Sequence, residues 1–313
     1  MEEVVVEPPP PSRVRIVITG ANGSVGRNLL AHVAKDAGIH AVATVRSERA
    51  AAALPARPLL DVRIVSSDDA DGLARAMAGA SSVVHLAGIL IESRSATYER
   101  ANVAATETAV DACRLASVSH LVLVSALGAD PESANRYRRS KGAGERAVEQ
   151  SGLDATIIRT PILLGPETAG AAAIMRAVSG GTARLLGGGG YLMRPLDVDD
   201  LSEAILGACR RRLPGVHVHE LAGPEPVSYR GLIERVAGLT GRSLAYQSVP
   251  IWGAKLAAAI TSRLTGGGVT PTVIDVITTS ETVQHNADRE LGVSLTPLSE
   301  TLGKLVAAWR NAA

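Results

Sequence analysis

The sequence predicts an α/β protein built on a doubly wound parallel sheet, followed by a smaller, mostly helical lobe. Through the first half of the 313 residues, short runs of β-branched and aliphatic residues alternate with longer, alanine-rich segments of helical period. That alternation is typical of βαβ units and a parallel sheet. A turn with evenly spaced glycines follows the first run, and beyond Gly165 helical segments separated by Gly- and Pro-rich loops take over.

The first half is expected to hold six strands and four helices. The strands are assigned to Val14–Thr19, Ala41–Arg46, Val62–Val65, Val83–Leu86, Leu121–Ser125 and Thr156–Arg159. The helices are assigned to Val25–Ala34, Leu73–Met77, Tyr98–Ala116 and Tyr137–Gln150. Residues 13–165 are expected to form the sheet domain and residues 166–313 the lobe, from which 194–222, with a strand at Val216–Leu221, return to the sheet.

The composition limits the classes of protein that the chain can represent. The 32 basic residues nearly balance the 31 acidic ones, so there is no electrostatic footprint for nucleic acid. Cys113 and Cys209 stand far apart, without a CxxC or Cys/His spacing. This favours neither a disulfide framework nor a metal site, and it agrees with a reduced, cytoplasmic setting.

No signal peptide or transmembrane segment is expected. Residues 1–12 are acidic and then proline-rich, without the basic flank and apolar core of a signal peptide, so we expect a disordered tail. The apolar run Val249–Ile260 is interrupted by Lys255 and is shorter than the ~20 residues that a membrane span needs. It is expected either to pack as a helix on the core or to contact a lipid surface.

The glycine-spaced turn lies in the stretch VITGANGSVGRN, residues 17–28. Gly20 would permit a tight turn, Gly23 would let the backbone approach phosphates, and Gly26 would allow close contact between helix and strand. Such a motif alone is compatible with an ordinary flexible turn. A strand before it and a helix after it favour a cradle that aims the helix N-terminus at a dinucleotide pyrophosphate, and hence a Rossmann domain.

The end of the second strand bears on which dinucleotide is bound. An acidic residue there would hold the 2′-hydroxyl of NAD, whereas arginine pairs with the 2′-phosphate of NADP. The sequence has Arg46, Ser47 and Arg49 at this point. NADP(H) is therefore preferred and NAD(H) stays possible; the alternative is a solvated loop with ordinary surface arginines.

With these features placed, the chain resembles the extended short-chain dehydrogenase/reductase superfamily. The resemblance rests on Asp68, on VHLAG at 84–88, on Asn102, on YRRSK at 137–141 and on C-terminal landmarks such as RPLDVDD at 194–200. The stretch VSALGADPESANRYRRSKGAGE, residues 124–145, is similar to the atypical branch that includes the NADPH-binding accessory subunit of respiratory complex I and its bacterial relatives.

The resemblance implies cofactor contacts, residue by residue. The pyrophosphate would be lined by Gly20, Asn22, Gly23, Ser24, Val25 and Gly26. Asp68 and Asp69 would lie by the adenine, and Leu86, Ala87 and Gly88 would pass under the riboses. Asp68 is alternatively a simple loop acid, and Asp71 is interpreted as a helix cap.

Tyr137 and Lys141 are the candidate acid/base pair. Residues four apart on a helix share a face, and an ammonium near a phenol lowers its pKa toward the working range of a general acid/base. In the superfamily this Tyr exchanges a proton with the substrate oxygen during hydride transfer, and the Lys also holds the nicotinamide ribose. The alternative is a surface helix within the basic run 136–141.

The third residue usually found in such a site, a hydroxyl beside the Tyr, is missing at its expected position. Superfamily enzymes usually polarise the carbonyl with the second residue of a Ser-Ser pair after the fifth strand, and this chain has Ser125 followed by Ala126. Ser125 is a candidate catalytic residue, or else a strand-end hydroxyl that satisfies the backbone. Asn102 would support the site or simply face solvent, and Pro161 and Ile162 are expected beside the nicotinamide.

The second lobe gives weaker indications. Arg194 is considered for an anionic substrate, and Asp199 or Asp200 as the cap of a helix over Leu201–Cys209. The glycine-rich segment 185–193 is interpreted as a mobile lid or a surface loop. An apolar substrate wall from Ile251, Trp252, Leu256 and Ile260 is the alternative to simple helix packing of these residues.

Three functions are weighed, all with a small-molecule partner and a possible homodimer. The first is an NADP(H)-dependent oxidoreductase with Tyr137 as acid/base and Lys141 as its tuner. The second, suggested by Ala126, is a non-catalytic protein that binds NADPH as a structural or redox-sensing ligand. The third is a nucleotide-sugar epimerase or dehydratase; dehydration would require an acidic residue at or near Ala126, and the sequence has none there.

Overall fold

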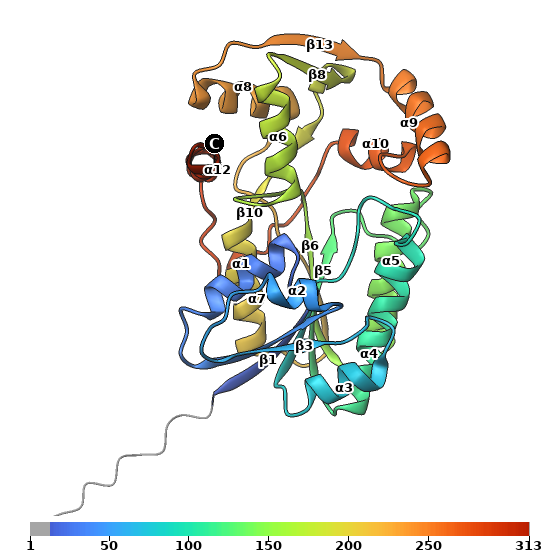
Figure 1. Cartoon of the computed structure of the whole chain (residues 1–313), viewed down its shortest axis with the longest axis vertical. Coiled ribbons are helices and arrows are strands. Elements are labelled where there is room, and N and C mark those ends of the chain that lie inside the picture. The colour runs from blue at the N-terminus through green and yellow to red at the C-terminus, as the bar shows by residue number, and fades with distance from the viewer. Residues whose placement is uncertain (1–12, 313) are drawn as a thin grey trace, which may run out of the picture.

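The protein centres on a seven-stranded parallel sheet, seen in a computed structural model that describes residues 13–312 (Figure 1). The expected tail, residues 1–12, lies outside the described residues. The strand order is β11-β6-β5-β4-β1-β2-β3. The strands are β1 (Val14–Thr19), β2 (Ile39–Val45), β3 (Leu60–Ile64), β4 (Ser82–His85), β5 (His120–Ala126), β6 (Asp154–Thr160) and β11 (Val216–Glu220). The doubly wound sheet is confirmed, and every predicted strand is present with ends shifted by at most two residues.

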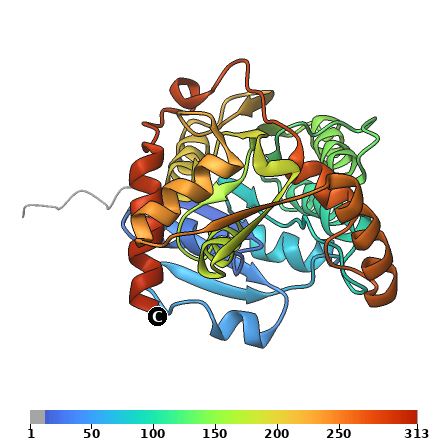
Figure 2. The same ribbon diagram turned by 90° about the horizontal axis from the view of Figure 1, so that it is seen from above.

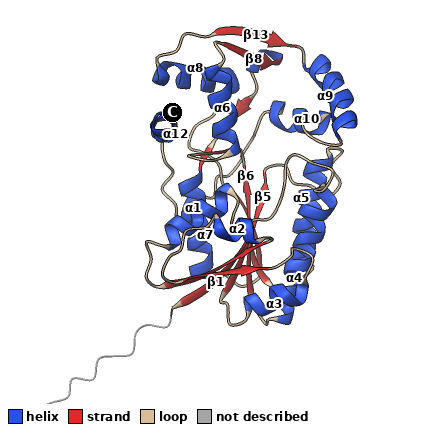
Figure 3. Cartoon of the chain, viewed as in Figure 1, coloured by secondary structure: helices blue, strands red, loops and turns tan. Residues whose placement is uncertain are grey.

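Helices cover both faces of this sheet (Figure 3). They are α1 (Ser24–Val33), α2 (Glu48–Ala52), α3 (Ala70–Met77), α4 (Ala105–Leu115), α5 (Arg136–Glu149) and α7 (Val198–Arg211). Side chains of β1 alternate between the faces: Ile16 lies in one core with Leu201 of α7, whereas Val17 lies in the other with Val110 of α4. Burial on both faces explains why the strands read as continuous aliphatic runs.

The second lobe stands over the carboxyl ends of the strands (Figures 1 and 2). Its short strands pair as β7 (Leu163–Leu164) with β10 (Leu196–Asp197), β8 (Thr182–Leu186) with β13 (Ala245–Val249), and β9 (Leu192–Met193) with β12 (Val227–Ser228). Its helices are α6 (Ala169–Ser179), α8 (Tyr229–Thr240), α9 (Ile251–Thr265), α10 (Pro271–Thr278), α11 (Asp288–Leu291) and α12 (Leu298–Ala312). Ligands of open α/β sheets bind at this end of the strands.

Two predicted helix starts are wrong, and with them the predicted caps. Helix α3 begins at Ala70, so Asp69, not Asp71, accepts the cap hydrogen bond from the Gly72 N–H (2.8 Å). Helix α7 begins at Val198, so Asp197 is its cap in place of Asp199 or Asp200. A cap must sit one residue before the first helical residue, so an error in the start moves the cap to another acid.

The predicted helix Tyr98–Ala116 is also not uniform. Its first turns are a π-helix, η1 (Glu99–Ala104), and regular α-helix follows only from Ala105. The Thr106 hydroxyl donates to the carbonyl oxygen of Asn102 at 2.9 Å, and such side-chain bonds compete with the regular helical ladder. π-turns within helices often mark functional sites, and Asn102 lies inside this one.

Candidate active site

The glycine turn between β1 and α1 has the geometry of a phosphate cradle. Gly20 has a φ of +71°, a conformation that favours glycine, and a side chain there would meet the backbone of Leu86 and Ala87. A methyl group on Gly26 would lie 2.5 Å from the carbonyl oxygen of Ala21, so α1 packs directly on the turn. Helix α1 begins right after Gly23, which has no side chain to cap it, leaving its first N–H groups for an anion.

A cavity of about 250 Å³ lies beside this turn. Of the predicted cofactor residues, it is lined by Gly20, Asn22, Gly23, Arg46, Leu86, Ala87 and Gly88. Ser24, Val25 and Gly26 stand behind the turn as the first residues of α1. The cavity also has walls that the sequence did not indicate, among them Val65 and Ser67 after β3. No sequence motif marks these two residues. They line the cavity only because β3 ends beside it.

The acids expected by the adenine have other partners. Asp68 is exposed and accepts a hydrogen bond from Ser66, which lowers its pKa. Asp69 caps α3. Neither carboxylate is among the residues that line the small cavity, where Ser67 takes the corresponding place. Their predicted contact with adenine stays a prediction.

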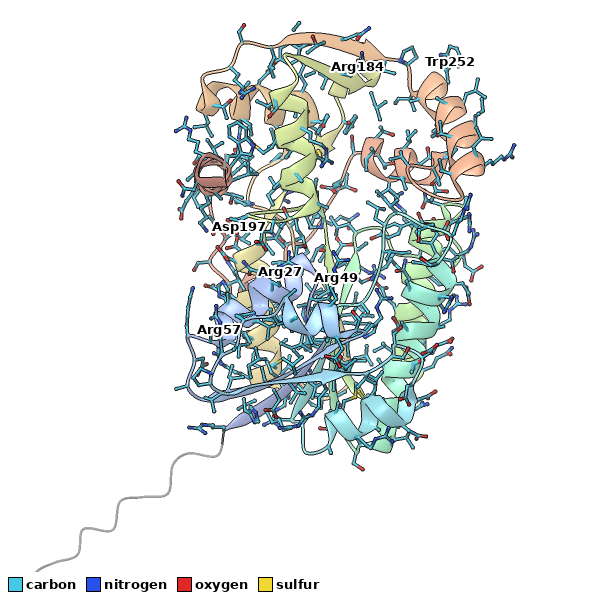
Figure 4. All side chains as sticks on the ribbon, viewed as in Figure 1. Arg27, Arg49, Arg57, Arg184, Asp197 and Trp252 are labelled. Atoms are coloured by element: carbon cyan, nitrogen blue, oxygen red, sulfur yellow. The ribbon has the colours of Figure 1, made fainter. Side chains whose placement is uncertain are left out.

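Arg46 and Arg49 stand exposed at the end of β2 and the start of α2 (Figure 4 labels Arg49). Neither forms an ion pair with a carboxylate among residues 13–312. Ser47 has a structural duty, since its hydroxyl caps α2 by accepting from the Ala50 N–H at 3.3 Å. Two guanidinium groups therefore remain available for a phosphate beside the small cavity.

Asn102 is buried and holds the loop that follows β4. Its Oδ1 accepts from the Ile89 N–H at 2.8 Å, and its Nδ2 donates to the Ile89 carbonyl oxygen at 3.1 Å and to the Ser140 hydroxyl at 2.9 Å. The alternative of a solvent-facing Asn102 is therefore wrong. By these bonds Asn102 ties Ile89, on the cavity wall, to helix α5.

His85 extends the same buried polar network and was not singled out by the sequence. Its ring nitrogens bond the hydroxyls of Thr19 (2.8 Å) and Thr106 (3.3 Å). Burial lowers the pKa of His85 to about 3, and the nearby Lys141 acts in the same direction. The ring is thus neutral at physiological pH and serves as a hydrogen-bonded wall of the small cavity.

Lys141 and Tyr137 leave α5 toward different surroundings. The Lys141 ammonium donates to the Val124 carbonyl oxygen at 3.0 Å, and a methyl group on Gly88 would lie 3.5 Å from its Nζ. Tyr137 is half-buried, lines the large cavity described below, and contacts the Tyr98 ring with centroids 5.8 Å apart. Tyr137 therefore faces the large cavity, whereas Lys141 lies beside Gly88, a residue of the small cavity's wall.

The expected lowering of the Tyr137 pKa is wrong. Burial raises the pKa of Tyr137 to about 12, with Tyr98 adding to the rise and Arg138 opposing it. Burial likewise lowers the pKa of Lys141 to about 8, against the opposing charge of Glu145. Both shifts follow from desolvation, which disfavours the charged form of each group.

The large cavity has a volume of about 1090 Å³ and lies between the sheet and the second lobe. Besides Tyr137, its lining includes the predicted nicotinamide neighbours Pro161 and Ile162. The sequence missed the other polar and aromatic lining residues, which include Arg138, Thr160, Arg184, Tyr191, Tyr229 and Glu281. They come from segments far apart in the chain, so no local pattern joins them.

Ser125 and Ala126 end β5 differently. Ser125 is buried, and its Oγ has no hydrogen-bond partner among the described residues. The side chain that follows, Ala126, lines the large cavity, whereas Ser125 does not. Thr160, next to this position on β6, brings a hydroxyl to the cavity wall. A catalytic role of Ser125 stays a prediction.

Two expectations for the second lobe are wrong. The Arg194 guanidinium donates to the carbonyl oxygens of Gly223 and Pro224, both at 3.1 Å, and is not part of the cavity lining. Trp252, Leu256 and Ile260 neither pack on the core nor line the large cavity; they are 74%, 57% and 54% exposed. These residues are apolar, but they lie on the side of helix α9 that is exposed to solvent.

Within the lobe, the glycine-rich segment forms one turn of 3-10 helix, Gly187–Gly189, between β8 and β9. Leu186, Tyr191 and Met193 beside it line the large cavity. Tyr191 stacks on Tyr229 with ring centroids 5.6 Å apart. The segment is therefore part of the cavity wall; a motion as a lid stays a prediction.

The glycine turn, the free helix N-terminus and the parallel sheet define a dinucleotide-binding Rossmann protein. The model of a family described as NAD(P)H-binding matches residues 20–184, and the chain belongs to this family. It is thus an NAD(P)-binding protein of an oxidoreductase family with a nicotinamide cofactor. None of the helices in residues 13–312 is both long enough and apolar enough to cross a membrane.

Several curated relatives are similar in sequence. The 4-hydroxy-2-methyl-3-oxo-4-farnesyl-3,4-dihydroquinoline-1-oxide ketoreductase of Stigmatella aurantiaca is 30% identical over 276 residues, 80% of each chain. A ceramide reductase of Caulobacter vibrioides is 33% identical over 48% of this chain and 47% of that protein. NADH dehydrogenase [ubiquinone] 1 alpha subcomplex subunit 9 of Arabidopsis thaliana is 30% identical over 61% of this chain and 48% of that protein. The match spans about half the length of the last two.

Solved structures share the fold. MoeE5 in complex with UDP-glucose and NAD superimposes with a TM-score of 0.75 at 22% identity, covering 95% of this chain and 99% of that one. The UDP-glucuronic acid 4-epimerase of Bacillus cereus, in complex with UDP-glucuronic acid and NAD, gives 0.74 at 17% identity, covering 96% and 100%. At this identity the likeness concerns the fold alone.

Proposed function

We propose that the protein is an NADPH-dependent ketoreductase that transfers hydride to the carbonyl of a small, largely apolar molecule. The observation that carries the proposal is the placement of Tyr137 and Lys141. Tyr137 lines the large cavity, and Lys141 lies beside Gly88 at the wall of the dinucleotide cavity. The names of two relatives, a farnesyl-dihydroquinoline-oxide ketoreductase and a ceramide reductase, support reduction of a lipophilic ketone.

The protonation states suit the direction of reduction. When bound, NADPH supplies the hydride. With a pKa of about 12, Tyr137 holds its proton at neutral pH and can donate it to the carbonyl oxygen as that oxygen gains negative charge. The Arg138 guanidinium, which favours the charged form of the Tyr137 phenol, stabilises the phenolate left behind. Lys141, with a pKa of about 8, is mostly an ammonium at pH 7. A proton taken up from solvent then restores the Tyr137 hydroxyl.

The preference for NADPH over NADH is part of the proposal. Arg46 lines the dinucleotide cavity, and Arg49 stands three residues further on α2; neither is engaged by a carboxylate of residues 13–312. A 2′-phosphate would gain two charge-assisted partners there. We expect Arg46→Ala to weaken NADPH binding about tenfold or more and to leave NADH binding nearly unchanged. Equal losses for both cofactors would contradict this assignment.

The decisive experiment measures turnover together with binding. NADPH binding is titrated, and NADPH absorbance is followed against a panel of long-chain and aromatic ketones. We expect Tyr137→Phe to retain NADPH affinity and to lose activity by about a hundredfold or more. Tyr246→Phe is the matched control. Tyr246 lies on β13, its ring contacts the Arg230 guanidinium, and it does not line the large cavity. Unaltered activity of Tyr137→Phe would exclude Tyr137 as the proton donor.

A second candidate function is favoured by Ala126. Its methyl group stands on the cavity wall where superfamily enzymes usually present a hydroxyl, which supports a protein that binds NADPH without turnover. NADPH binding with no ketone reduced, by wild type or by Ala126→Ser, would favour this role. A gain of activity in Ala126→Ser would instead support a ketoreductase with a weakened carbonyl contact. Epimerisation or dehydration of nucleotide sugars is supported by the fold alone.

A further inference from the structure

Helix α9 presents an apolar stripe to solvent. Trp252, Leu256, Ile260 and Leu264 repeat every four residues and are 74%, 57%, 54% and 75% exposed. Ala258 is the only buried residue of α9. Figures 1 and 2 both place α9 at the periphery of the molecule, and Figure 4 shows Trp252 at its outer edge. A contiguous apolar face of this kind marks an interaction surface.

The stripe continues beyond the helix. The turn after α9 lies against the loop after β4, since the Gly268 N–H donates to the Glu92 carbonyl oxygen at 2.9 Å. These two segments add the exposed side chains of Val269 (49%) and Ile91 (48%). We call Trp252, Leu256, Ile260, Leu264, Val269 and Ile91 together the outer patch.

The charges near the outer patch that are not paired with an opposite charge are cations. Helix α9 and the turn after it, residues 251–270, contain no Asp or Glu and have two cations, Lys255 and Arg263. Arg263 is exposed on α9 itself, and Arg94 packs against Gly266 at the end of that helix. Glu92 and Asp275 at the margin are each paired with a cation, Arg136 and Lys255. An apolar face flanked by Lys and Arg suits an anionic surface.

We propose that the outer patch docks the protein on the surface of an anionic lipid bilayer. A helix with Trp and Leu on one side and cations beside them lies in the interface, with the apolar side chains among the acyl chains. A second copy fits less well, because a two-fold contact would bring Arg263 of both copies together without an acid on either α9. No helix of the described chain needs to cross the membrane for this contact.

The outer patch adjoins the large cavity. Helix α10 packs on α9, and Val276 and Ile277 of α10 line the cavity. Leu90, the neighbour of Ile91 in the chain, lines it too. Docking through the patch therefore turns this side of the cavity toward the bilayer, where an apolar substrate dissolves. The docking itself does not depend on the proposed ketone reduction.

The test is sedimentation of the full chain with lipid vesicles. One set is made of equal parts phosphatidylglycerol and phosphatidylcholine, the other of phosphatidylcholine alone. We expect binding to the anionic vesicles that added salt weakens. The double variant Leu256→Gln/Leu264→Gln should lower the partition coefficient by about tenfold or more. Leu115→Gln, at a position 61% exposed on α4, is the matched control and should bind as wild type does.

A spectroscopic measurement locates the contact. The chain has two tryptophans, so Trp309→Phe leaves Trp252 as the only one. Its emission should shift to the blue on adding anionic vesicles and should be quenched by brominated acyl chains. Absence of vesicle binding, or wild-type binding by the double variant, would overturn the proposal. So would a vesicle-free homodimer that the double variant dissociates, because the patch would then belong to a second copy.

Discussion

Gly26→Ala tests the close packing of α1 on the phosphate turn. The added methyl carbon would lie 2.5 Å from the carbonyl oxygen of Ala21 and 2.6 Å from its carbonyl carbon and Cα. These are backbone atoms of a fully buried residue, so no flexible side chain can move aside. Reaching an ordinary contact requires a displacement of about 1 Å between the helix and the turn. We expect a loss of stability of about 1–3 kcal/mol.

The displacement matters for the cofactor because the N–H groups of α1 and the turn must face the same pyrophosphate. A shift of this size breaks hydrogen-bond geometry, and two lost bonds to a charged phosphate correspond to about a hundredfold weaker NADPH binding. The measurement is titration of NADPH by fluorescence or calorimetry, at a temperature where unfolding curves show the variant to be folded.

Gly303→Ala is the matched control for this prediction. It makes the same substitution in helix α12, where an added methyl group would meet nothing within 4 Å. It should leave NADPH affinity unchanged and raise the stability by about 0.5–1 kcal/mol, the usual difference between glycine and alanine in a helix. If Gly26→Ala binds NADPH as tightly as wild type, the turn does not need its contact with α1, and the reasoning is refuted.

Three further predictions concern the buried groups around the site. Burial lowers the pKa of His85 from 6.5 to about 3, so below pH 6.5 the unfolded chain binds a proton at His85 that the native protein does not bind, and the free energy of unfolding decreases. Between pH 6.5 and about pH 5, urea unfolding should show that His85→Asn loses about 2 kcal/mol less stability than wild type does. Glu145→Gln removes the partner of Arg159, which it binds at 2.6 Å, and should cost about 3 kcal/mol in denaturant, while exposed Glu149→Gln costs little; equal costs would contradict this. Asn102→Ala frees the loop after β4 and should weaken NADPH binding by about tenfold; unchanged affinity would show that the loop holds its position without these bonds.

The parallel sheet and the phosphate turn were predictable because their signals are local. A strand buried on both faces carries successive aliphatic residues, such as Ile16–Ile18 of β1 and Val83 and Val84 of β4. Gly20 and Gly26 carry their information in the chain itself, since a left-handed turn and a helix packed on backbone exclude larger residues. Tyr137 and Lys141 were found by their spacing on one helix. The predictions of the helix caps were wrong because each cap depends on the exact residue at which its helix begins.

The sequence by itself determined the fold class, the nicotinamide-binding family and the candidate acid/base pair. Only the tertiary structure decided what each side chain meets. It raised the pKa of Tyr137 by burial, engaged Arg194 with backbone carbonyls, and assembled the large cavity from distant segments. It also turned Trp252 and its neighbours outward, which excludes packing on the core, one of the two alternatives for this apolar run. Burial depends on which elements pack together, and no local pattern of residues fixes that.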